Sequence, residues 1–516
     1  MTDGEHSPGP VPRKNGNGAN VLNARRIGID TQYEAVVFMR RDCPVCKSEG
    51  FTSQNRVRLT HGSQTVIATL FQTAPGFLDH GEVGLSEAAW RRLGMNNGGT
   101  VIVSHPRPLD SLSLLRGKVY GNPLEAHSVK VIIEDIVAGR YSDIHLSSFV
   151  TACSAQPLDH AEMVALTAAM TDAGDRLEWG TYPVVDKHCV GGLPGNRTTP
   201  IIVAVAAACG LTMPKTSSRA ITSPAGTADT METLAPVDLD ITTMRQVVER
   251  EGGCIAWGGA VRLSPADDTL IRVERALDLD GEGQLVASVL SKKIAAGSSH
   301  VILDLPVGPT AKVRSQEAAR VLSRNLIAVA HAFDIEARTI ITDGRQPVGR
   351  GIGPALEARD VLAVLQGTAD APPDLRDRAV ALAGHLLELG GAAAAGNGTG
   401  LAARTLDEGG AWRKFQAICE AQGGMRVPPR AGHFRPVLAN RAGKVTAIDN
   451  RRLAKVAKLA GAPVAKAAGV EIHVQLGMTV TSGEPLYTVH AEAPGELAYS
   501  FDYVAANSDI IEMTEV

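Results

Sequence analysis

One stretch restricts the fold of this chain more than any other: residues 186–200 read DKHCVGGLPGNRTTP and run directly into the apolar segment 201–209. Glycines let the backbone turn sharply and approach a ligand closely, and a helix start offers unpaired N–H groups with a partial positive charge. Lys187 adds a full positive charge beside them. The stretch predicts a phosphate-binding loop between a strand and a helix, although an ordinary strand-turn-helix connection would share its glycines.

Strands and helices alternate from residue 182 onward. The candidate strands are 184–185, 254–257, 300–304 and 339–342. The candidate helices are 201–209, 285–296, 315–333 and two more that begin at Pro354 and Pro373. Such alternation predicts a mainly parallel sheet covered by helices. Ligands of these sheets bind beyond the carboxyl ends of the strands, where the glycine loop would lie.

The pattern differs in the other parts of the chain. Near the N-terminus, β-branched runs predict strands at 36–39, 57–60, 65–70 and 100–103, with one helix over 85–93. Residues 124–138 have helical spacing, and Asp159 with Glu162 forms a capping-box signature for a helix that ends at Ala173. Near the C-terminus, three more strands are predicted at 443–448, 470–474 and 484–490.

We therefore expect a multidomain α/β protein, because 516 residues exceed what one core supports. It would combine a β-rich N-terminal domain, a helical domain, a large α/β domain with a mainly parallel sheet, and a C-terminal α+β domain similar to the hybrid barrel of biotinyl modules. The expected bounds are 1–25 for a flexible tail, 26–105 for the N-terminal domain, 106–178 with 215–247 for the helical domain, 179–214 with 248–430 for the α/β domain, and 431–516 for the C-terminal domain.

Two segments allow more than one interpretation. The glycine- and alanine-rich segment 390–400 predicts a mobile loop, which is either a lid over a substrate or a solvated connection. Cys43 and Cys46 form a C-x-x-C pair that is either half of a metal site or two partly buried thiols in a turn. Since no second pair follows at zinc-finger spacing, we expect no metal.

Composition excludes several classes of partner. The net charge is -4 and aromatic residues make up 4% of the chain, which argues against a general binder of nucleic acid or anionic membranes. Seven cysteines in a chain of this length indicate a reducing compartment. The N-terminal residues do not resemble a signal peptide, and no apolar run reaches the ~18 residues of a membrane helix. We expect a cytoplasmic protein.

Four further groups of residues carry chemistry. Residues 215–229 hold six hydroxyls around Arg219, which suits the polar edge of a nucleobase or a second phosphate, although a hydroxyl-rich loop at a helix cap is the plainer interpretation. Ser288 and Lys292 would share one helix face. Asp280 lies in a turn and could act as a general acid. Lys312 follows a glycine turn after the predicted strand 300–304 and can point toward the same sheet edge.

Taken in order, these groups resemble those of the thymidine phosphorylase / AMP phosphorylase family of pentosyltransferases. The resemblance covers residues 109–516 and rests on the motifs DKHCVGGLPGN, SSRAITSPAGTAD, ASVLSKK and TDGRQPVGRGIGPALEARD. It implies a helical domain that faces a large α/β domain, with base and phosphate brought together as a cleft closes. It also implies a homodimer or larger homo-oligomer that needs no cofactor, since inorganic phosphate is a substrate.

The resemblance also implies roles for individual residues. Asp280 or His188 would give a proton to the departing base. The residues implied to hold phosphate are Lys187, Cys189, Gly191 and Gly192. The residues implied to contact the nucleoside or nucleotide are Gly192, Ser218, Arg219, Ala220, Ile221, Thr222, Ser223, Thr227, Ser288, Lys292 and Lys312. Among these, Arg219, Ser288 and Lys292 would grip the pyrimidine. The family usually has serine at position 189, so Cys189 is a departure that replaces a hydroxyl by a weaker thiol donor.

The implied reaction is phosphorolysis of the N-glycosidic bond of a pyrimidine nucleoside, thymidine and phosphate giving thymine and 2-deoxy-α-D-ribose 1-phosphate. The alternative substrate is a nucleoside 5′-monophosphate such as AMP, CMP or UMP, whose 5′-phosphate Lys312 would help to hold. A non-enzymatic nucleotide sensor and a phosphoribosyltransferase are further alternatives. Retention of Lys187, Arg219 and Asp280 disfavours the sensor, and the chain has no clear motif for the pyrophosphate-and-magnesium site that the phosphoribosyltransferase would need.

Overall fold

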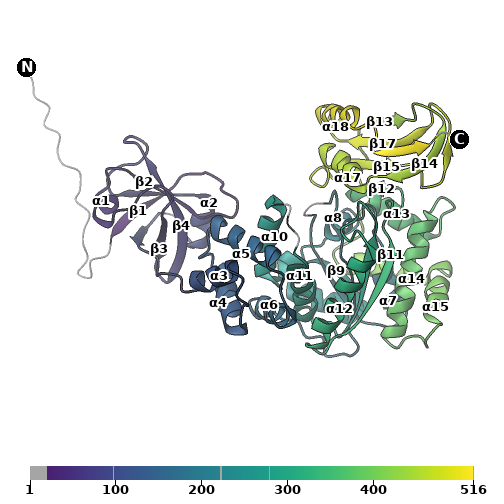
Figure 1. The fold of residues 1–516 in the computed structure, drawn as a ribbon, viewed down its shortest axis with the longest axis horizontal. Helices are drawn as coiled ribbons and strands as arrows, with labels where there is room; N and C mark the ends of the chain where they lie inside the picture. Colours follow the sequence, from purple (N-terminus) through teal and green to yellow (C-terminus); the bar gives the residue numbers. More distant parts are fainter. Residues whose placement is uncertain (1–19, 97, 221–222, 278, 280, 515–516) are drawn as a thin grey trace, which may run out of the picture. The chain divides into compact units, whose positions relative to one another are not determined.

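The computed structural model describes residues 20–96, 98–220, 223–277, 279 and 281–514. It divides into two compact units, one formed by the chain up to residue 113 with residues 138–142, and the other by residues 114–137 with 143 onward. The multidomain α/β organisation expected from the sequence is confirmed (Figure 1).

The first unit is a barrel (Figure 1). It is closed by six strands in the order β1-β5-β2-β4-β3-β6. Its elements are β1 (Val21–Arg26), β2 (Val36–Arg40), α1 (Pro44–Glu49), β3 (Arg56–His61), β4 (Gln64–Thr73), β5 (Glu82–Leu85), α2 (Glu87–Arg92) and β6 (Thr100–Ser104). The four strands predicted from β-branched runs all form. Alternate residues of these strands point inward and build one apolar core.

Two expectations for this unit were wrong. Residues 21–25 are expected in a flexible tail but belong to β1, whose backbone pairs with β5 on one side and β6 on the other. The predicted helix over 85–93 is shorter, since Leu85 ends strand β5 and Ser86 starts the helix by accepting the Ala89 N–H. Cys43 and Cys46 are buried in the barrel core. Within the described ranges, no group of three or more metal-ligating side chains comes together.

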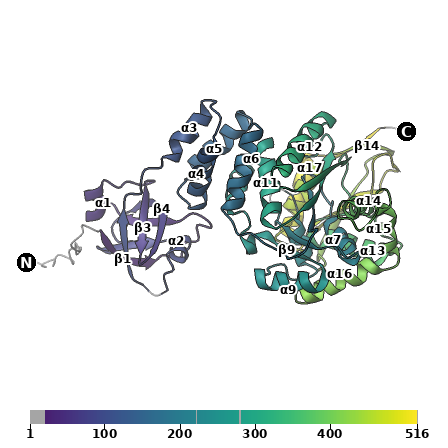
Figure 2. The same cartoon turned by 90° about the horizontal axis from the view of Figure 1, so that it is seen from below.

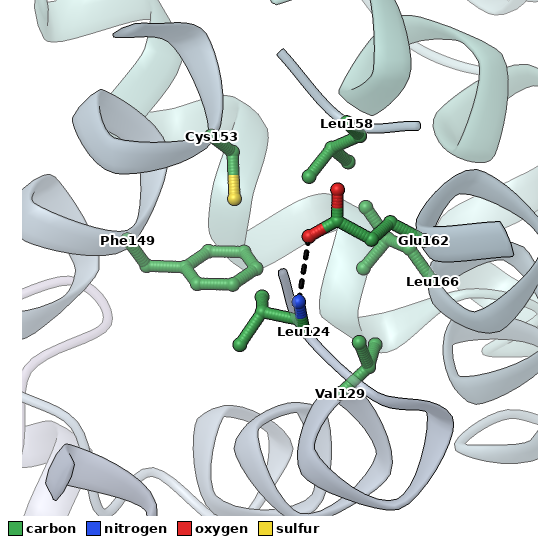
Figure 3. Close-up of a pocket in the computed structure, with 7 residues that line it drawn as sticks. All are labelled: Leu124, Val129, Phe149, Cys153, Leu158, Glu162 and Leu166. Atoms are coloured by element: carbon green, nitrogen blue, oxygen red, sulfur yellow. Dashed lines mark hydrogen bonds between the residues drawn. The ribbon is translucent and has the colours of Figure 1, made fainter. Parts of the chain in front are cut away.

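The second unit begins with a helical bundle. It contains α3 (Ser111–Val119), α4 (Ala126–Val137), α5 (Asp143–Ala155), α6 (His160–Asp172), α10 (Pro265–Leu277) and α11 (Glu282–Ala295). Helices α10 and α11 lie within residues 248–430, which are expected in the α/β domain, but they pack on the bundle helices α5 and α6. The predicted capping box is confirmed, because Asp159 accepts the Glu162 N–H and Glu162 accepts the Asp159 N–H. The other carboxylate oxygen of Glu162 accepts the Leu124 N–H at 2.7 Å, amid apolar side chains (Figure 3). Lys118 Nζ donates to that oxygen at the same distance.

A parallel sheet follows the bundle. Strands β7 (Val185–Cys189), β10 (His300–Val307) and β11 (Glu336–Asp343) pair in the order β11-β10-β7. Strands β8 (Met213–Ser217) and β9 (Gly253–Trp257) pair in parallel, and a bridge between Val184 and Thr212 links them to β7. All five strands run in one direction. Their carboxyl ends therefore share one edge, as the sequence predicts.

Helices lie on both sides of this sheet (Figure 2). They are α7 (Thr199–Ala208), α8 (Thr227–Glu232), α9 (Ile241–Glu251), α12 (Gln316–His331), α13 (Pro354–Gln366), α14 (Pro373–Leu389), α15 (Gly398–Asp407) and α16 (Gly410–Ala421), with a short 3₁₀ turn Gly258–Val261 after β9. The helix predicted after the glycine loop is α7. Its residues 199–207 are all buried, and α7 with α13, α14 and α16 forms an apolar core on the sheet.

Two further expectations need correction. Residues 215–247 were assigned to the helical domain, but Lys215–Ser217 completes strand β8, and α8 and α9 pack on the neighbouring β9. The segment 390–400 was expected to be a mobile loop, but Glu388 accepts the N–H groups of Gly396 and Gly398, and α15 begins at Gly398. Hydrogen bonds to an ionised carboxylate are among the stronger ones in proteins, so they restrain the loop.

The C-terminal part combines two sheets and two helices. One sheet has the order β12-β15-β17-β13 and the other β16-β14-β18. Their elements are β12 (Gly351–Ile352), β13 (His433–Leu438), β14 (Gly443–Ile448), α17 (Asn450–Leu459), β15 (Gly469–Ile472), β16 (Thr479–Val480), β17 (Pro485–Ala491), α18 (Pro494–Ala506) and β18 (Ile511–Thr514). The three predicted strands form. Strand β12 comes from the α/β segment and adds to this sheet, so the two domains share backbone pairing.

Candidate active site

The predicted glycine loop joins β7 to α7 at the carboxyl edge of the parallel sheet. Lys187 comes from β7 and is only 1% exposed. Its Nζ donates to Oγ1 of Thr198, the residue that precedes α7, at 3.0 Å. Nζ also lies 3.5 Å from Oδ2 of Asp304 on β10. A lysine charge therefore sits beside the N-terminus of a buried helix, an arrangement that favours anions.

Glycine is required where this loop meets the turn after β10. Gly192 has a φ of +79°, and a Cβ there would lie 2.5 Å from the backbone nitrogen of Lys312. Any other side chain would force the two loops apart. Gly191 also has a positive φ, +93°. The structure thus brings together two segments, Gly191–Gly192 and Lys312, that the sequence analysis singled out separately.

Asp304 organises the side of the loop that faces β10. Its Oδ2 accepts Nδ2 of Asn196 at 3.1 Å, and its Oδ1 accepts the hydroxyl of Thr342 at 2.7 Å. Burial raises the pKa of Asp304, but Lys187, Thr342 and Arg378 together hold it below its ordinary value. The carboxylate therefore stays ionised and fixes Lys187.

Cys189 lies at the end of β7 next to this group. Nδ2 of Asn196 is 3.3 Å from its sulfur. Burial and the nearby Asp304 charge raise the pKa of the Cys189 thiol to about 11. The thiol is protonated at neutral pH, so it can offer a bound anion only a weak hydrogen bond.

A second buried carboxylate, Asp186, lies one residue before Lys187 on β7 and binds two lysines. Its Oδ2 is 2.5 Å from Nζ of Lys293, and its Oδ1 is 3.1 Å from Nζ of Lys215. Burial raises the pKa of Asp186, yet the two lysines hold it below its ordinary value. Burial also lowers the pKa of Lys215 to about 7, with Lys293 adding to the effect against the opposing pull of Asp186.

These residues form what we call the lysine cluster: Lys187, Lys215 and Lys293 with Asp186 and Asp304. All five are buried. When every lysine is protonated, these five groups carry one more positive than negative charge. Because an uncompensated charge in a dry interior is costly, such a cluster favours a bound anion.

His188 lies within the influence of the same lysines. Burial, followed by the charges of Lys293, Lys215, Lys292 and Lys187, lowers its pKa well below the ordinary value. Its imidazole is neutral at physiological pH and can donate one hydrogen bond and accept another. Lys292 extends from α11, where its Nζ donates to Ser288 Oγ at 3.2 Å and to Asp267 Oδ2 at 2.7 Å. The predicted pair Ser288 and Lys292 is thus formed on one helix face.

The hydroxyl-rich segment after β8 is held by Asp229 on α8. Asp229 Oδ2 accepts the N–H groups of Ala220 and Gly226, at 2.6 and 3.0 Å. Ser223 Oγ donates to the Ala225 carbonyl at 2.9 Å, and the Ser218 carbonyl accepts the Ala228 N–H. Ile221, Thr222 and Asp280 lie outside the described residues.

Arg197 connects this segment to the glycine loop. Its guanidinium donates to Thr227 Oγ1 at 2.8 Å and to the Ala225 carbonyl at 2.9 Å. Its Nε donates to Glu357 Oε2 at 2.6 Å. Glu357 is buried on α13 and also accepts the Thr230 hydroxyl. The two predicted ligand loops are therefore tied to each other through one arginine.

The guanidinium of Arg219 contacts other side chains of the protein. It donates from both Nη atoms to Glu232, at 2.8 Å each, and its guanidinium is 4.9 Å from the centre of the Trp257 ring. The hydrogen bonds to Glu232 raise the pKa of Arg219 above the ordinary value. The contacts of Arg219 and of Lys292 go to different side chains, so their joint grip on a pyrimidine stays a prediction.

Comparison with known proteins places this geometry in a family. Residues 181–412 match the glycosyl transferase family a/b domain, residues 112–174 the glycosyl transferase family helical bundle domain, and residues 444–510 the pyrimidine nucleoside phosphorylase C-terminal domain. "Putative thymidine phosphorylase 2" of Acidovorax sp. (strain JS42) is 62% identical over 496 residues, 96% of this chain and 97% of that relative. "Putative thymidine phosphorylase" of Polaromonas sp. (strain JS666 / ATCC BAA-500) is 61% identical, with 96% and 97% covered.

The chain belongs to the thymidine phosphorylase family. As a member of that family it is a pentosyltransferase, in agreement with the resemblance seen in its motifs. Among solved structures, anthranilate phosphoribosyltransferase from Thermus thermophilus matches with a TM-score of 0.52 at 19% identity, covering 60% of this chain and 99% of that chain. This likeness concerns the fold. Among the described residues, no helix is both long and apolar enough to cross a bilayer.

Several residues of this candidate site are not predicted from the sequence. They are Asp186, Asn196, Arg197, Lys293, Asp304 and Glu357. Most of them lie inside motifs that carry the resemblance, in which the glycines and hydroxyls give the stronger sequence signal. A usable signal was present for Glu357, since an acid within the apolar start of a helix is rarely buried without a cationic partner.

Proposed function

We propose that this pentosyltransferase catalyses the reversible phosphorolysis of a pyrimidine nucleoside, thymidine and phosphate giving thymine and 2-deoxy-α-D-ribose 1-phosphate. The observation that carries the proposal is the lysine cluster, whose excess positive charge lies beside the N-terminus of α7. Phosphate is the anion that such a site suits. The names of the relatives support the nucleoside as the second substrate.

In the proposed reaction an oxygen of phosphate bonds to C1′ of the sugar as the bond from C1′ to the base nitrogen breaks. The electron pair of that bond leaves with the base, which then takes up a proton. Lys187, Thr198 and the amides of the glycine loop would fix phosphate for attack, and fixed geometry is the main source of rate in such a displacement. The step balances without a metal or an organic cofactor.

Asp280 remains the proposed proton donor. His188 is the second candidate, and its depressed pKa bears on its role. A neutral imidazole would have to become an anion to give up a proton, which is unfavourable. His188 is therefore better suited to donate a hydrogen bond to phosphate or to the base, while Ser288 and Lys292 stabilise the negative charge that grows on the base.

A nucleoside 5′-monophosphate is the second candidate substrate. The close contact between Gly192 and the Lys312 backbone supports it, because it brings a lysine outside the lysine cluster next to the glycine loop. A monophosphate needs two anion sites, one for the attacking phosphate and one for the 5′-phosphate.

A substrate panel tests both candidates. Purified protein is incubated with phosphate and thymidine, uridine, AMP, CMP or UMP, and the released base is measured by chromatography, with phosphate-free reactions as the control. Phosphate-dependent release of thymine from thymidine is the expected result. Release from the monophosphates alone would replace the first candidate by the second, and no release from any substrate would contradict both.

A further inference from the structure

Lys466, in the C-terminal domain, reaches the helix that anchors the hydroxyl-rich segment. Its Nζ is 2.7 Å from Oε2 of Glu232 and 3.5 Å from Oδ1 of Asp229, both on α8. The backbone on either side of this lysine is held in place. The Lys466 carbonyl accepts the Ala355 N–H at the start of α13, and the Ala467 N–H donates to Glu492 at 2.8 Å.

Both carboxylates that Lys466 contacts act on the hydroxyl-rich segment. Asp229 binds the Ala220 and Gly226 amides with one oxygen, and its other oxygen lies 3.5 Å from Arg219 as well as from Lys466. Glu232 binds both Arg219 Nη atoms and Lys466 Nζ. Arg219 and Lys466 thus both contact the carboxylates of Asp229 and Glu232. Asp229 in turn binds backbone amides on both sides of the part of the segment that the structure leaves undescribed.

The electrostatics agree with a shared role. The hydrogen bond from Arg219 is the main reason why the pKa of Glu232 falls to about 2, burial opposes it, and Lys466 adds to the lowering. Without Lys466, Arg219 would be the one cation of this group left beside three carboxylates, those of Glu232, Asp229 and Asp238. Asp238 is 3.4 Å from Arg219. Two neighbouring carboxylates that lose a cation repel each other, and the amides bound by Asp229 would be held less firmly.

We propose that Lys466 is a positioning residue, through which the C-terminal domain sets the hydroxyl-rich segment and Arg219 for nucleoside binding. The inference rests on the proposed function for its substrate. It gives the C-terminal domain a part in the active site, although that domain places Lys466 on the carboxylates of α8 and not on the substrate itself.

Three variants test this inference. Lys466→Met removes the charge and keeps the side-chain volume, Lys466→Arg keeps the charge, and Lys455→Met is a matched control at an exposed lysine on α17 of the same domain. Lys466 is 31% exposed at its side chain, so its effect should be moderate. We expect Lys466→Met to raise KM for the nucleoside about fivefold and to change KM for phosphate by less than about twofold.

The conservative and control variants sharpen the result. Lys466→Arg should restore most of the nucleoside affinity, and Lys455→Met should behave as wild type. A double-mutant cycle of Lys466→Met with Glu232→Gln should be clearly non-additive, because the two residues act through one contact. An unchanged nucleoside KM in Lys466→Met, or an equal rise in both KM values, would overturn the inference.

Hydrogen exchange separates this inference from the proposed function. In the substrate-free protein, the Ala220 and Gly226 amides should exchange faster in Lys466→Met than in wild type or Lys455→Met, since Asp229 binds these amides. If wild type releases no base from any nucleoside, the proposed function fails and exchange alone decides the structural part. Unchanged exchange at both amides would then reject the role of Lys466.

Discussion

The second unit contains two kinds of buried ion pair, and they differ in charge balance. In the helical bundle, Lys118 faces Glu162 at 2.7 Å. Glu162 also accepts the Asp159 N–H and the Leu124 N–H, the latter drawn in Figure 3. In this pair one lysine neutralises one carboxylate, and both carboxylate oxygens accept hydrogen bonds. At the carboxyl edge of the parallel sheet, the lysine cluster sets three lysines against two carboxylates.

This difference separates a structural pair from a binding site. A balanced buried pair needs nothing further, and breaking it destabilises the fold. In the unbalanced cluster, Lys215 and Lys293 share the single carboxylate of Asp186. Burial lowers the pKa of Lys215 to about 7, and the charge of Lys293 adds to this lowering. The excess charge is relieved either by losing a proton or by gaining an anion. Substitutions in the two groups should therefore have opposite effects on stability and on activity.

The largest expected effect comes from Lys187→Met. We expect kcat/KM for phosphorolysis to fall about 10³-fold, because a fixed positive charge next to the attacking phosphate is lost. Asp304 would keep Asn196 and Thr342 as hydrogen-bond donors, so the fold should lose less stability than in a broken balanced pair. Steady-state kinetics with varied phosphate measures the loss. Near-wild-type turnover would show that phosphate does not bind at Lys187.

Lys118→Met should lower the stability of the fold and leave the activity nearly unchanged. Removing the cation leaves the buried Glu162 carboxylate without its charged partner, and we expect unfolding to become easier by ~3 kcal/mol. The folded fraction should keep kcat and both KM values within about twofold, because this pair binds no substrate. Urea unfolding followed by circular dichroism gives the stability, and kinetics at low temperature gives the activity. If activity falls as far as in Lys187→Met, charge balance does not distinguish the two pairs.

The contrast also shows what the sequence could reveal. The glycine loop, the capping box at Asp159 and the parallel strands follow from local patterns, and these were predicted. The partners of the charged residues were not, because Lys293 reaches Asp186 across 107 residues and Arg197 reaches Glu357 across 160. Nor can a sequence tell whether a guanidinium faces a ligand or, as for Arg219, a carboxylate. Strand β1 was missed because its polar residues continue the composition of the preceding tail.

A third prediction concerns pH. An anion bound beside the lysine cluster stabilises protonated Lys215 and raises its pKa, so binding takes up a proton and affinity falls as pH rises above the free value of about 7. Sulfate is a suitable probe because it does not titrate in this range. Its inhibition constant against phosphate should rise about tenfold between about pH 6 and about pH 8.5. Cys189 should not contribute, since the pKa of its thiol is raised to about 11. Burial and the nearby lysines lower the pKa of His188, away from this range.

The control for this pH effect is Lys215→Met. Without the titrating amine, sulfate inhibition should be weaker at the acid end and nearly independent of pH. A slope that persists in Lys215→Met would assign the proton to another group and would remove the argument that the cluster holds a surplus charge.

The smallest effect should come from Cys189→Ser. The Cys189 thiol is protonated, and its sulfur accepts a hydrogen bond from Nδ2 of Asn196 at 3.3 Å. A hydroxyl at this position would be a stronger donor toward an anion in the loop. We expect KM for phosphate to fall about threefold with kcat nearly unchanged, which corresponds to one improved hydrogen bond in ground state and transition state alike. A rise in KM would mean that the loop geometry is fitted to the larger sulfur atom. In that case the surplus charge of the cluster, and not the donors of the loop, would dominate phosphate affinity.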